Sequence, residues 1–488
     1  MKSMIKRFAD KYKHMSNVVK ASLWFVACSV VQKSISFITT PIFARLMTVE
    51  QYGYYNTYLS WLQIVAVFCT LNMHSCVYIN GLAKNDSSSD NHKMAVSMLS
   101  LSFCITASLF AIYMIFHEYI NSVAGMETSL FLLMFCEILF QPALNFWIVK
   151  QRFEYKYIGM VALTLSMTFA NAGLGILFVI SSAENNTAFA RILSIAMVQA
   201  IIGGTCWLIY IWKAKMIFSV KEWKHALKVQ VPLIPHGLSV IVLASSDRIM
   251  INSMIGATAA GYYSLAYSIQ FIVKSIKDSI VEAIKPWIYL RIKEKRIKEI
   301  RDLVYSMVFL VMTLSVIIMT LAPEIVLLMG GKKYLEAAYA IPPVIGSTFF
   351  MFVYNICIMF ESYHEEVKKI TLVSICCAAA NIVLNYLFIP VFGYIAAGYT
   401  TLFCYIMFCV LHYFIMHGLC IRRYEGNQIF EVKFLVIMSL IVLAINILMV
   451  ILYRFNLLRY VVLGIAIVIA VLQRRRIAGI VSIIRHKT

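Results

Sequence analysis

The sequence contains few charged residues for a chain of its length. Only 14% of its 488 residues are charged, whereas 61% are hydrophobic. A soluble globular domain carries about 25% charged residues and about half apolar ones, so this composition excludes a soluble protein. It predicts an all-α polytopic membrane protein, in which long apolar segments cross the bilayer as helices.

The sequence also lacks the usual signatures of catalytic and metal-binding sites. It contains no metal-ligand spacing, no glycine-rich phosphate loop and no nucleophile elbow. The twelve cysteines lie almost wholly within apolar segments, so we expect neither a disulfide framework nor a metal site. The connections that should face outward are too short to form a catalytic domain. We therefore expect no cofactor and no enzymatic activity.

Fourteen apolar segments can be recognised, and most contain the roughly 20 apolar residues that a helix needs to cross a bilayer. They lie at about 20–45, 57–83, 94–116, 128–149, 158–181, 189–212, 229–254, 261–285, 302–323, 338–360, 369–390, 394–416, 433–453 and 456–473. The polar start of the chain has no short apolar run with a small-residue cleavage site, so no removable signal peptide is expected.

Basic residues are concentrated on one side of these segments. Of the 43 lysines and arginines, 33 lie in the terminal regions and in every second connection, and 7 lie in the other connections. This is the positive-inside pattern of a multi-pass protein whose N- and C-termini are both cytoplasmic. Anionic phospholipid headgroups next to these residues account for the net charge of +20, so no nucleic acid is expected as a partner.

A repeated motif divides the first twelve segments into two halves. Gly53-Tyr54-Tyr55 recurs 208 residues later as Gly261-Tyr262-Tyr263, and near the same offset Asn171 corresponds to Asn381. The alternative is a chance similarity between two tyrosine-rich helix starts. Two six-helix halves with one orientation are typical of transporters with a central cavity. We predict lobes at 1–212 and 229–416, a cytoplasmic connecting segment at 213–228, and two further helices with a basic tail at 417–488.

Polar residues follow one face of the eighth segment. They recur at steps of three and four residues, which places them on one side of a helix. They are Tyr263, Tyr267, Gln270, Lys274, Lys277, Asp278, Glu282 and Lys285. A lysine that faces lipid near mid-span costs about 2.5–3.5 kcal/mol on insertion scales.

We therefore predict that the first five residues of this stripe line a cavity and bind substrate. The alternative is that Lys274 and Lys277 pair with Asp278 and Glu282 along the helix and extend toward the membrane surface. Asp278 is also a candidate ion-coupling residue.

The first segment carries a third intramembrane lysine. Lys33 lies near its middle, and Pro41 in the same segment would suit a moving gate or hinge. We predict that Lys33 lines the cavity. The alternative is a structural pair with Glu137, near mid-depth in the fourth segment, and Glu137 is either that partner or a protonatable coupling site.

The seventh segment combines a predicted hinge with two adjacent charges. Pro232, Pro235 and Gly237 at its start favour a kink, because they leave backbone groups unpaired. Near its other end, Asp247 and Arg248 point in different directions on a helix, so each needs its own partner. Arg248 in the cavity would bind phosphate, and Asp247 is a candidate site for a coupled H+ or Na+. The alternative is that the pair caps the outer helix end.

Several stretches resemble the bacterial polysaccharide-transporter family. They are Phe43 to Leu46, Glu50 to Gly53, Pro232 to Ser239, Asp247 to Ile251, Gly261 to Ser264, and the run Asn381, Asn385, Pro390, Gly393 and Gly398. In this order they touch both halves of the chain. The family includes O-antigen and capsule repeat-unit flippases and belongs with multidrug extrusion proteins and lipid II flippases. The resemblance implies two pseudo-symmetric six-helix lobes in a V around a central cavity, with alternating access.

The resemblance also implies a substrate, undecaprenyl-pyrophosphate-linked oligosaccharide moved to the outer leaflet of the bacterial cytoplasmic (inner) membrane. Cations in a cavity lower the cost of placing a pyrophosphate there, and tyrosine rings and hydroxyls can contact sugars. Polymerase and chain-length proteins of the same pathway are the expected protein partners. The alternatives are a cation-coupled multidrug exporter, which would need an acidic cavity, and a polysaccharide polymerase, which the short outer connections disfavour.

Overall fold

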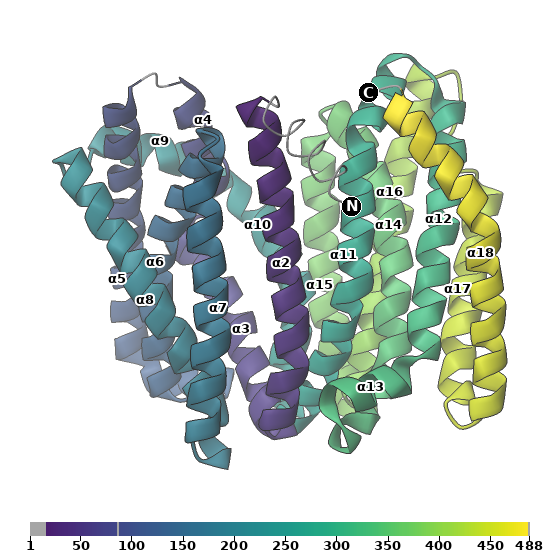
Figure 1. Cartoon of the computed structure of the whole chain (residues 1–488), viewed down its shortest axis with the longest axis horizontal. Helices are drawn as coiled ribbons and strands as arrows, with labels where there is room; N and C mark the ends of the chain where they lie inside the picture. The colour runs from purple at the N-terminus through teal and green to yellow at the C-terminus, as the bar shows by residue number, and fades with distance from the viewer. Residues whose placement is uncertain (1–15, 85–86, 487–488) are drawn as a thin grey trace, which may run out of the picture. The chain divides into compact units, whose positions relative to one another are not determined.

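The computed structural model describes residues 16–84 and 87–486, and every regular element in this part of the chain is a helix (Figure 1). The predicted all-α architecture is therefore confirmed for the described residues. The basic residues between Lys2 and Lys13 lie outside them. Long helices are the expected solution for apolar segments, because a backbone in lipid must satisfy its own hydrogen bonds.

The α-helices follow one another with short connections. They are α2 (Asn17–Leu46), α3 (Val49–Thr70), α4 (Val77–Lys84), α5 (Ser88–Ala124), α6 (Thr128–Phe153), α7 (Tyr157–Ser181), α8 (Thr187–Ala214), α9 (Val220–Gln230), α10 (Ile234–Met254), α11 (Ala257–Lys293), α12 (Ile297–Thr320), α13 (Ala322–Gly330), α14 (Ile341–Tyr363), α15 (Val367–Phe392), α16 (Tyr394–Arg423), α17 (Val432–Leu452) and α18 (Asn456–His486). The 3-10 helices are η1 (Met73–Ser75), η2 (Glu184–Asn186), η3 (Val231–Leu233) and η4 (Lys332–Ala340).

The helices form two compact units. The first contains residues up to Gln51 and Tyr58–Gly237, and the second contains Tyr52–Thr57 and the chain from Leu238 onward. The break at Gly237 lies within the segment predicted as a hinge, a few residues beyond the predicted start of the second lobe at 229. The short stretch Tyr52–Thr57 at the start of α3 belongs to the second unit by its contacts.

In the first unit, α8 packs against α5, α6 and α7, and α2 packs against α7. A core at one end gathers Tyr78, Phe146 and Tyr210 with α9. The predicted connecting segment 213–228 thus contains a separate helix. Trp223 of α9 holds it in place by donating a 2.7 Å hydrogen bond from Nε1 to the carbonyl oxygen of Ser97 in α5.

In the second unit, α14 is the central helix and packs against α11, α12, α16 and α17. Pro342 and Pro343 occupy its first turn, where a missing N–H costs nothing. Its phenylalanines, such as Phe352 and Phe360, are fully buried in the core. α17 and α18 lie beside each other, and both contact α12 (Figure 1).

Each of the fourteen predicted segments contains a helix, but not all of these helices are equally apolar. Among the described residues, eleven helices are long and apolar enough to cross a membrane, or twelve if the bent pair formed by α3 and η1–α4 is one span. α11 occupies the eighth predicted segment but is less apolar, because it carries the polar stripe. α18 occupies the fourteenth, and its apolar part, Asn456–Leu472, is shorter than the others. The basic tail predicted after residue 473 continues the backbone of α18.

Two left-handed backbone turns recur in the two halves. Tyr155 (φ 55°) and Glu365 (φ 60°) follow α6 and α14, and Lys215 (φ 51°) and Glu425 (φ 54°) follow α8 and α16. Both pairs are 210 residues apart. A non-glycine residue with positive φ is uncommon, so this recurrence supports the internal repeat inferred from the sequence.

The two copies of the repeated glycine motif touch each other within the second unit. A Cβ atom on Gly53 would lie 1.9 Å from the carbonyl oxygen of Ala257 and 2.5 Å from the backbone nitrogen of Gly261. Two helix backbones can approach this closely only where a side chain is missing. The glycine is therefore required by packing.

The predicted hinge residues have different backbone environments. Pro232 lies in η3 between α9 and α10, and Pro235 and Gly237 lie in the first turn of α10. Here the chain changes from α-helix to 3-10 helix and back, which is how a proline-containing break is commonly accommodated. Pro41, by contrast, lies inside α2, which continues as one helix to Leu46.

Candidate functional site

Asp247 is the centre of a buried polar cluster in the second unit. Its side chain, on α10, is 1% exposed. The carboxylate accepts hydrogen bonds from the Tyr263 hydroxyl (2.5 Å), the Thr401 hydroxyl (2.7 Å) and Nδ2 of Asn385 (2.7 Å). Four residues from α10, α11, α15 and α16 therefore meet at one carboxylate.

A second layer of neutral groups closes this cluster. Asn381 donates to the Thr401 hydroxyl (3.1 Å) and accepts from the Ser246 hydroxyl (3.0 Å). Asn385 accepts a hydrogen bond from the Thr400 hydroxyl, and donates to Asn381 (3.2 Å) as well as to Asp247. The cluster thus presents carboxylate, amide and hydroxyl oxygens within a few ångströms of one another.

The partners of Asp247 do not neutralise its charge. Its three hydrogen-bond partners are neutral, and among the described residues it forms no ion pair within 4 Å. The positive charge of Arg248 acts on the Asp247 carboxylate, but the two side chains form no ion pair within 4 Å. An ionised carboxylate in a spanning helix is costly and usually binds a proton or a cation. Oxygen ligands of this kind suit a small hard cation.

Arg248 and the two tyrosines of the stripe adjoin this cluster. The Arg248 guanidinium lies over the ring of Tyr267, 4.8 Å from its centroid, and the rings of Tyr263 and Tyr267 are 5.1 Å apart. The Tyr263 side chain is fully buried, so its hydroxyl serves Asp247. Tyr267 and Arg248 are only half-buried, so parts of both side chains can also reach a ligand, although the Tyr267 hydroxyl is buried.

The polar stripe on α11 divides into two rows. Tyr263, Gln270 and Lys277, spaced by seven residues, are buried. Nε2 of Gln270 donates to the carbonyl oxygen of Val344 (2.6 Å) and to the Ser347 hydroxyl (2.9 Å) of α14. Gln270 therefore joins two helices, whereas the predicted role was substrate contact.

The two lysines of this helix differ. Lys277 is 2% exposed, and its Nζ atom lies 2.6 Å from Oδ1 of Asp278, whose side chain is 47% exposed. This is the along-helix pairing that the sequence left open for Lys277. Lys274 is half-buried, on the more accessible row with Tyr267.

In the first unit, Lys33 and Glu137 are separate. Lys33 is exposed on α2. Glu137 on α6 is 7% exposed and accepts a 3.2 Å hydrogen bond from the Tyr58 hydroxyl. No ion pair within 4 Å joins the two in the described part of the chain. The lysine is thus available to a ligand, and the carboxylate belongs to a different local environment.

A further buried cation lies near Glu137. Arg191 on α8 is 8% exposed, and its guanidinium donates to the carbonyl oxygen of Asn171 (2.6 Å) and to the Ser194 hydroxyl (3.3 Å). It also lies over the ring of Phe43, 4.1 Å from its centroid. Its charge interacts with the Glu137 carboxylate.

Sequence reasoning missed the polar residues that complete the Asp247 cluster. Thr400, Thr401 and Asn385 come from α15 and α16, and they meet α10 only in the folded protein. A signal was nevertheless present, because Asn381 and Asn385 lie one helical turn apart in an apolar segment. Of the described residues, no group of three or more histidines, cysteines or acidic residues is placed to hold a metal ion.

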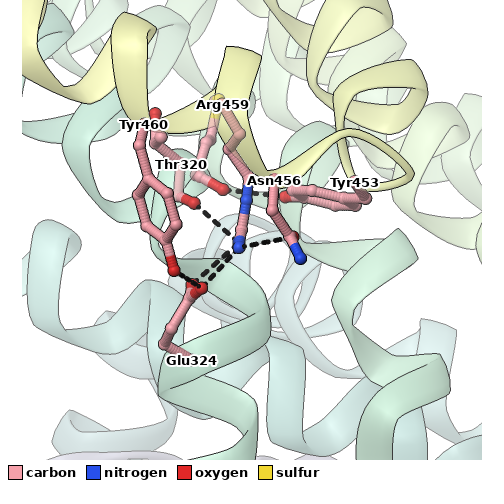
Figure 2. A network of polar contacts seen from close by, with 7 residues as sticks. Thr320, Glu324, Tyr453, Asn456, Arg459 and Tyr460 are labelled. Carbon is pink, nitrogen blue, oxygen red and sulfur yellow. Dashed lines mark hydrogen bonds and ion pairs between the residues drawn. The ribbon is translucent and has the colours of Figure 1, made fainter.

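An ion pair holds α18 to the short helix α13 (Figure 2). Arg459, whose side chain is 2% exposed, makes two hydrogen bonds to the Glu324 carboxylate, one of them 2.7 Å long. The guanidinium also donates to the carbonyl oxygen of Thr320 (3.1 Å) and to Oδ1 of Asn456 (3.1 Å). The Tyr460 hydroxyl donates to Glu324 (2.6 Å).

The comparisons with known proteins agree with this architecture. Residues 18–290, more than half of the chain, match a family of polysaccharide biosynthesis proteins. The chain belongs to this family. An uncharacterized membrane protein of Haemophilus influenzae is 21% identical over 374 residues, which cover 74% of this chain and 87% of the relative.

Solved transporters share the fold of this polysaccharide biosynthesis protein. The lipid II flippase MurJ, in an inward closed conformation, superposes with a TM-score of 0.72 at 13% identity, covering 93% of this chain and all of the flippase. An inward-facing multidrug resistance transporter of the MATE family and MOP superfamily gives a TM-score of 0.61 at 13% identity, covering 80% and 96%. The protein is thus a multi-pass membrane protein of a polysaccharide biosynthesis family, and its fold is the one found in these two transporters.

Proposed function

We propose that the protein flips undecaprenyl-pyrophosphate-linked oligosaccharide repeat units from the cytoplasmic to the outer leaflet of the bacterial inner membrane. The product would enter O-antigen, capsule or exopolysaccharide assembly. Membership of a polysaccharide biosynthesis family supports the pathway, and a fold similar to that of a lipid II flippase supports the type of step. The observation that supports this substrate in particular is the presence of cationic side chains on spanning helices.

These cations suit a pyrophosphate headgroup. Lys33 is exposed, Lys274 is half-buried, and Arg248 is held over the Tyr267 ring, so all three can meet an anion. Cations in a cavity with low-dielectric walls attract phosphate strongly. The charge of Lys277 is partly neutralised by Asp278, so it contributes less. The half-buried Tyr267 ring offers a contact surface for sugar rings.

The cycle that we propose uses both units as the lobes of an alternating-access transporter. All fourteen predicted segments cross the membrane, including α11 and α18. Both termini are cytoplasmic, which the concentration of 33 of the 43 basic residues on one side supports. The polyprenyl chain stays in the bilayer while the headgroup crosses.

We further propose that Asp247 couples this cycle to an ion gradient. The carboxylate is buried and accepts hydrogen bonds from neutral partners, among them the Thr401 hydroxyl and the Asn385 amide, and the Asn381 amide lies in the next layer. Either Na+ or H+ can neutralise it. Asp278 and Glu137 are the other candidates, but Asp278 is paired with Lys277 and more exposed.

The test is the sidedness of the lipid-linked oligosaccharide. The gene is deleted in its host, spheroplasts are prepared, and a membrane-impermeant lectin or glycosidase is added to the labelled repeat units. Repeat units that accumulate but stay inaccessible until the gene is restored would support the flippase. Normal accessibility without the protein would contradict it, and accessible but unpolymerised single units would indicate a polymerase.

A cation-coupled multidrug exporter is the second candidate, because the fold also resembles that of a multidrug resistance transporter. A cavity for cationic drugs needs acidic side chains. Of the accessible charges described above, those on Lys33, Lys274 and Arg248 are positive, and the one acidic side chain, Asp278, is paired with Lys277. Drug sensitivity of the deletion strain, with normal repeat-unit accessibility, would favour the exporter.

A further inference from the structure

An apolar groove of about 660 Å³ is formed by α15 and α16 in the second unit, near the ends of these helices that meet at Gly393. Its walls include Leu384, Phe388 and Phe392 of α15 and Tyr399, Thr400 and Phe403 of α16. None of the lining residues, all in the described part of the chain, is charged, and four are aromatic. The volume lies within the range of about 300–1,000 Å³ that is usual for ligand-binding pockets.

The rings of this groove are left uncovered by the rest of the described chain. Phe388 is 41% exposed, Phe403 53% and Phe392 66%. Both helices are long and apolar enough to cross a membrane, so the medium around the groove is hydrocarbon. An apolar ligand gains nothing there by leaving water, because lipid chains are equally apolar. A ligand that is preferred over bulk lipid must therefore fit the shape of the groove and pack against its rings.

The apolar lining is particular to the second unit. The left-handed turns that flank α7–α8 and α15–α16 are 210 residues apart, and this offset places Asn185 and Asn186 at the repeat positions of Ile395 and Ala396. The two asparagines are exposed, whereas the two apolar residues line the groove. A lining required only by contact with lipid would be expected in both halves at this depth. The difference therefore indicates a ligand that one half binds and the other does not.

The groove shares a side chain with the Asp247 cluster. Thr400 lines the groove, and its hydroxyl donates a hydrogen bond to the Asn385 side chain. Nδ2 of Asn385 in turn donates to the Asp247 carboxylate (2.7 Å). A molecule in the groove therefore lies against the same pair of helices that holds Asp247.

The position of the groove along these helices matches one part of the substrate. In the proposed topology, the connection at Gly393 is an outward one. Once a lipid-linked oligosaccharide has crossed, its headgroup lies at the outer leaflet and the isoprene units next to the headgroup lie in the outer half of the bilayer. These units carry methyl branches and double bonds, whose shape differs from that of a straight acyl chain and suits packing between aromatic rings.

We propose that the α15–α16 groove binds the isoprene units next to the headgroup of the flipped substrate, and so holds the product at the outer leaflet beside the Asp247 cluster. This inference rests on the proposed function, in which the polyprenyl chain stays in the bilayer while the headgroup crosses. It assigns Phe388, Phe403 and their aromatic neighbours a role in selecting a polyprenyl chain over the acyl chains of phospholipids.

The inference is tested by photo-crosslinking in the full-length protein, purified in detergent. Phe403→p-benzoylphenylalanine places a photoreactive ring in the groove, and the probe is radiolabelled undecaprenyl phosphate. The matched control is Phe414→p-benzoylphenylalanine, because Phe414 lies on the same helix, is 64% exposed and does not line the groove. We expect labelling at position 403 to exceed that at position 414 several-fold. Unlabelled undecaprenyl phosphate should suppress it, whereas the same excess of phosphatidylglycerol should not.

Two results would overturn the inference. Equal labelling at the two positions would show that the groove holds polyprenyl no better than any lipid-facing surface. Equal competition by phosphatidylglycerol would show that an ordinary acyl chain fills it.

A second measurement uses the affinity for undecaprenyl phosphate, read from the rise in melting temperature with its concentration. Phe403→Ala should bind this lipid roughly tenfold more weakly than the wild type, the factor expected when a chain loses contact with one aromatic side chain. Phe414→Ala should bind it as the wild type does. If Phe403→Ala does not fold, Phe388→Ala on the facing helix replaces it, with the same expected weakening. Wild-type affinity in the groove variant would contradict the inference.

Failure of this inference can be told apart from failure of the proposed function. Repeat units that are inaccessible to lectin in the deletion strain, together with unselective labelling, would contradict the groove and support the flippase. Normal accessibility together with selective labelling would contradict the flippase and support a polyprenyl-binding groove.

Discussion

The ion pair between Arg459 and Glu324 should hold the C-terminal helix in place. Replacing Arg459 with methionine keeps much of the side-chain volume but removes the hydrogen bonds to Glu324, Thr320 and Asn456 (Figure 2). Breaking a buried ion pair costs about 3–5 kcal/mol. The Glu324 side chain is 37% exposed, so water compensates for part of the loss, and we expect a net cost of roughly 2–3 kcal/mol.

The assay is thermal unfolding of the purified protein in detergent. For a unit of this size, 1 kcal/mol corresponds to a shift of about 2–4 °C, so Arg459→Met should melt on the order of 4–12 °C below the wild type. Arg454→Met is the matched control, because Arg454 lies in the connection just before α18 and is exposed. It should melt at the wild-type temperature. Equal melting temperatures for the two variants would refute the reasoning.

The pH dependence of this difference follows from Glu324. Burial raises the pKa of its carboxyl, but hydrogen bonds from Arg459 and Tyr460 outweigh burial and hold the pKa below its usual value. A carboxyl whose pKa is lowered by folding stabilises the fold above its unfolded pKa, about 4.3, and this contribution is lost as the pH falls through the folded pKa. The difference between wild type and Arg459→Met should therefore be constant from pH 6 to 8 and decrease only below about pH 4.

Three further outcomes are expected. Lys274→Ala should reduce repeat-unit export roughly tenfold or more at normal expression, because a charge-assisted contact of about 1.5–3 kcal/mol is lost. Lys274→Arg should retain export. Unchanged export by the alanine variant would remove Lys274 from the site. Asp247→Asn should make export independent of the ion gradient in vesicles, and an unaltered gradient dependence would exclude coupling there. Gly53→Ala should lower stability by about 1–3 kcal/mol through overpacking, measured against Gly173→Ala, where a Cβ atom meets open space; equal melting of the two would contradict the close backbone contact.

The sequence was sufficient to predict the helices but not their partners. Apolar length and the alternation of basic residues are properties of single segments, and a helix lies in every predicted span. α11 shows the limit of this reasoning. Its polar residues share one helix face, as their spacing predicts, yet Gln270 is used to bind α14 while Lys274 stays accessible. A face of one helix does not reveal which residues a neighbouring helix will cover.

The Asp247 cluster shows the same limit on a larger scale. The sequence identified Asp247 as a coupling candidate, because an acidic residue in a spanning helix is costly. It did not identify Thr401, which is an ordinary residue in an apolar segment until α16 packs beside α10. Arg191 was overlooked for the opposite reason: counted among the basic residues of an outward connection, it is a buried side chain in the folded unit.

The left-handed turns after α6 and α14 indicate how the chain evolved. Tyr155 and Glu365 adopt the same uncommon backbone conformation, although their side chains share no chemistry. Local steric preference would select glycine at both positions, and neither has it. A left-handed conformation that is kept at equivalent positions, without the glycine that favours it, is the pattern expected of a duplicated ancestral unit. In this protein, the two halves resemble each other more in their backbone angles at these turns than in the amino acids found there.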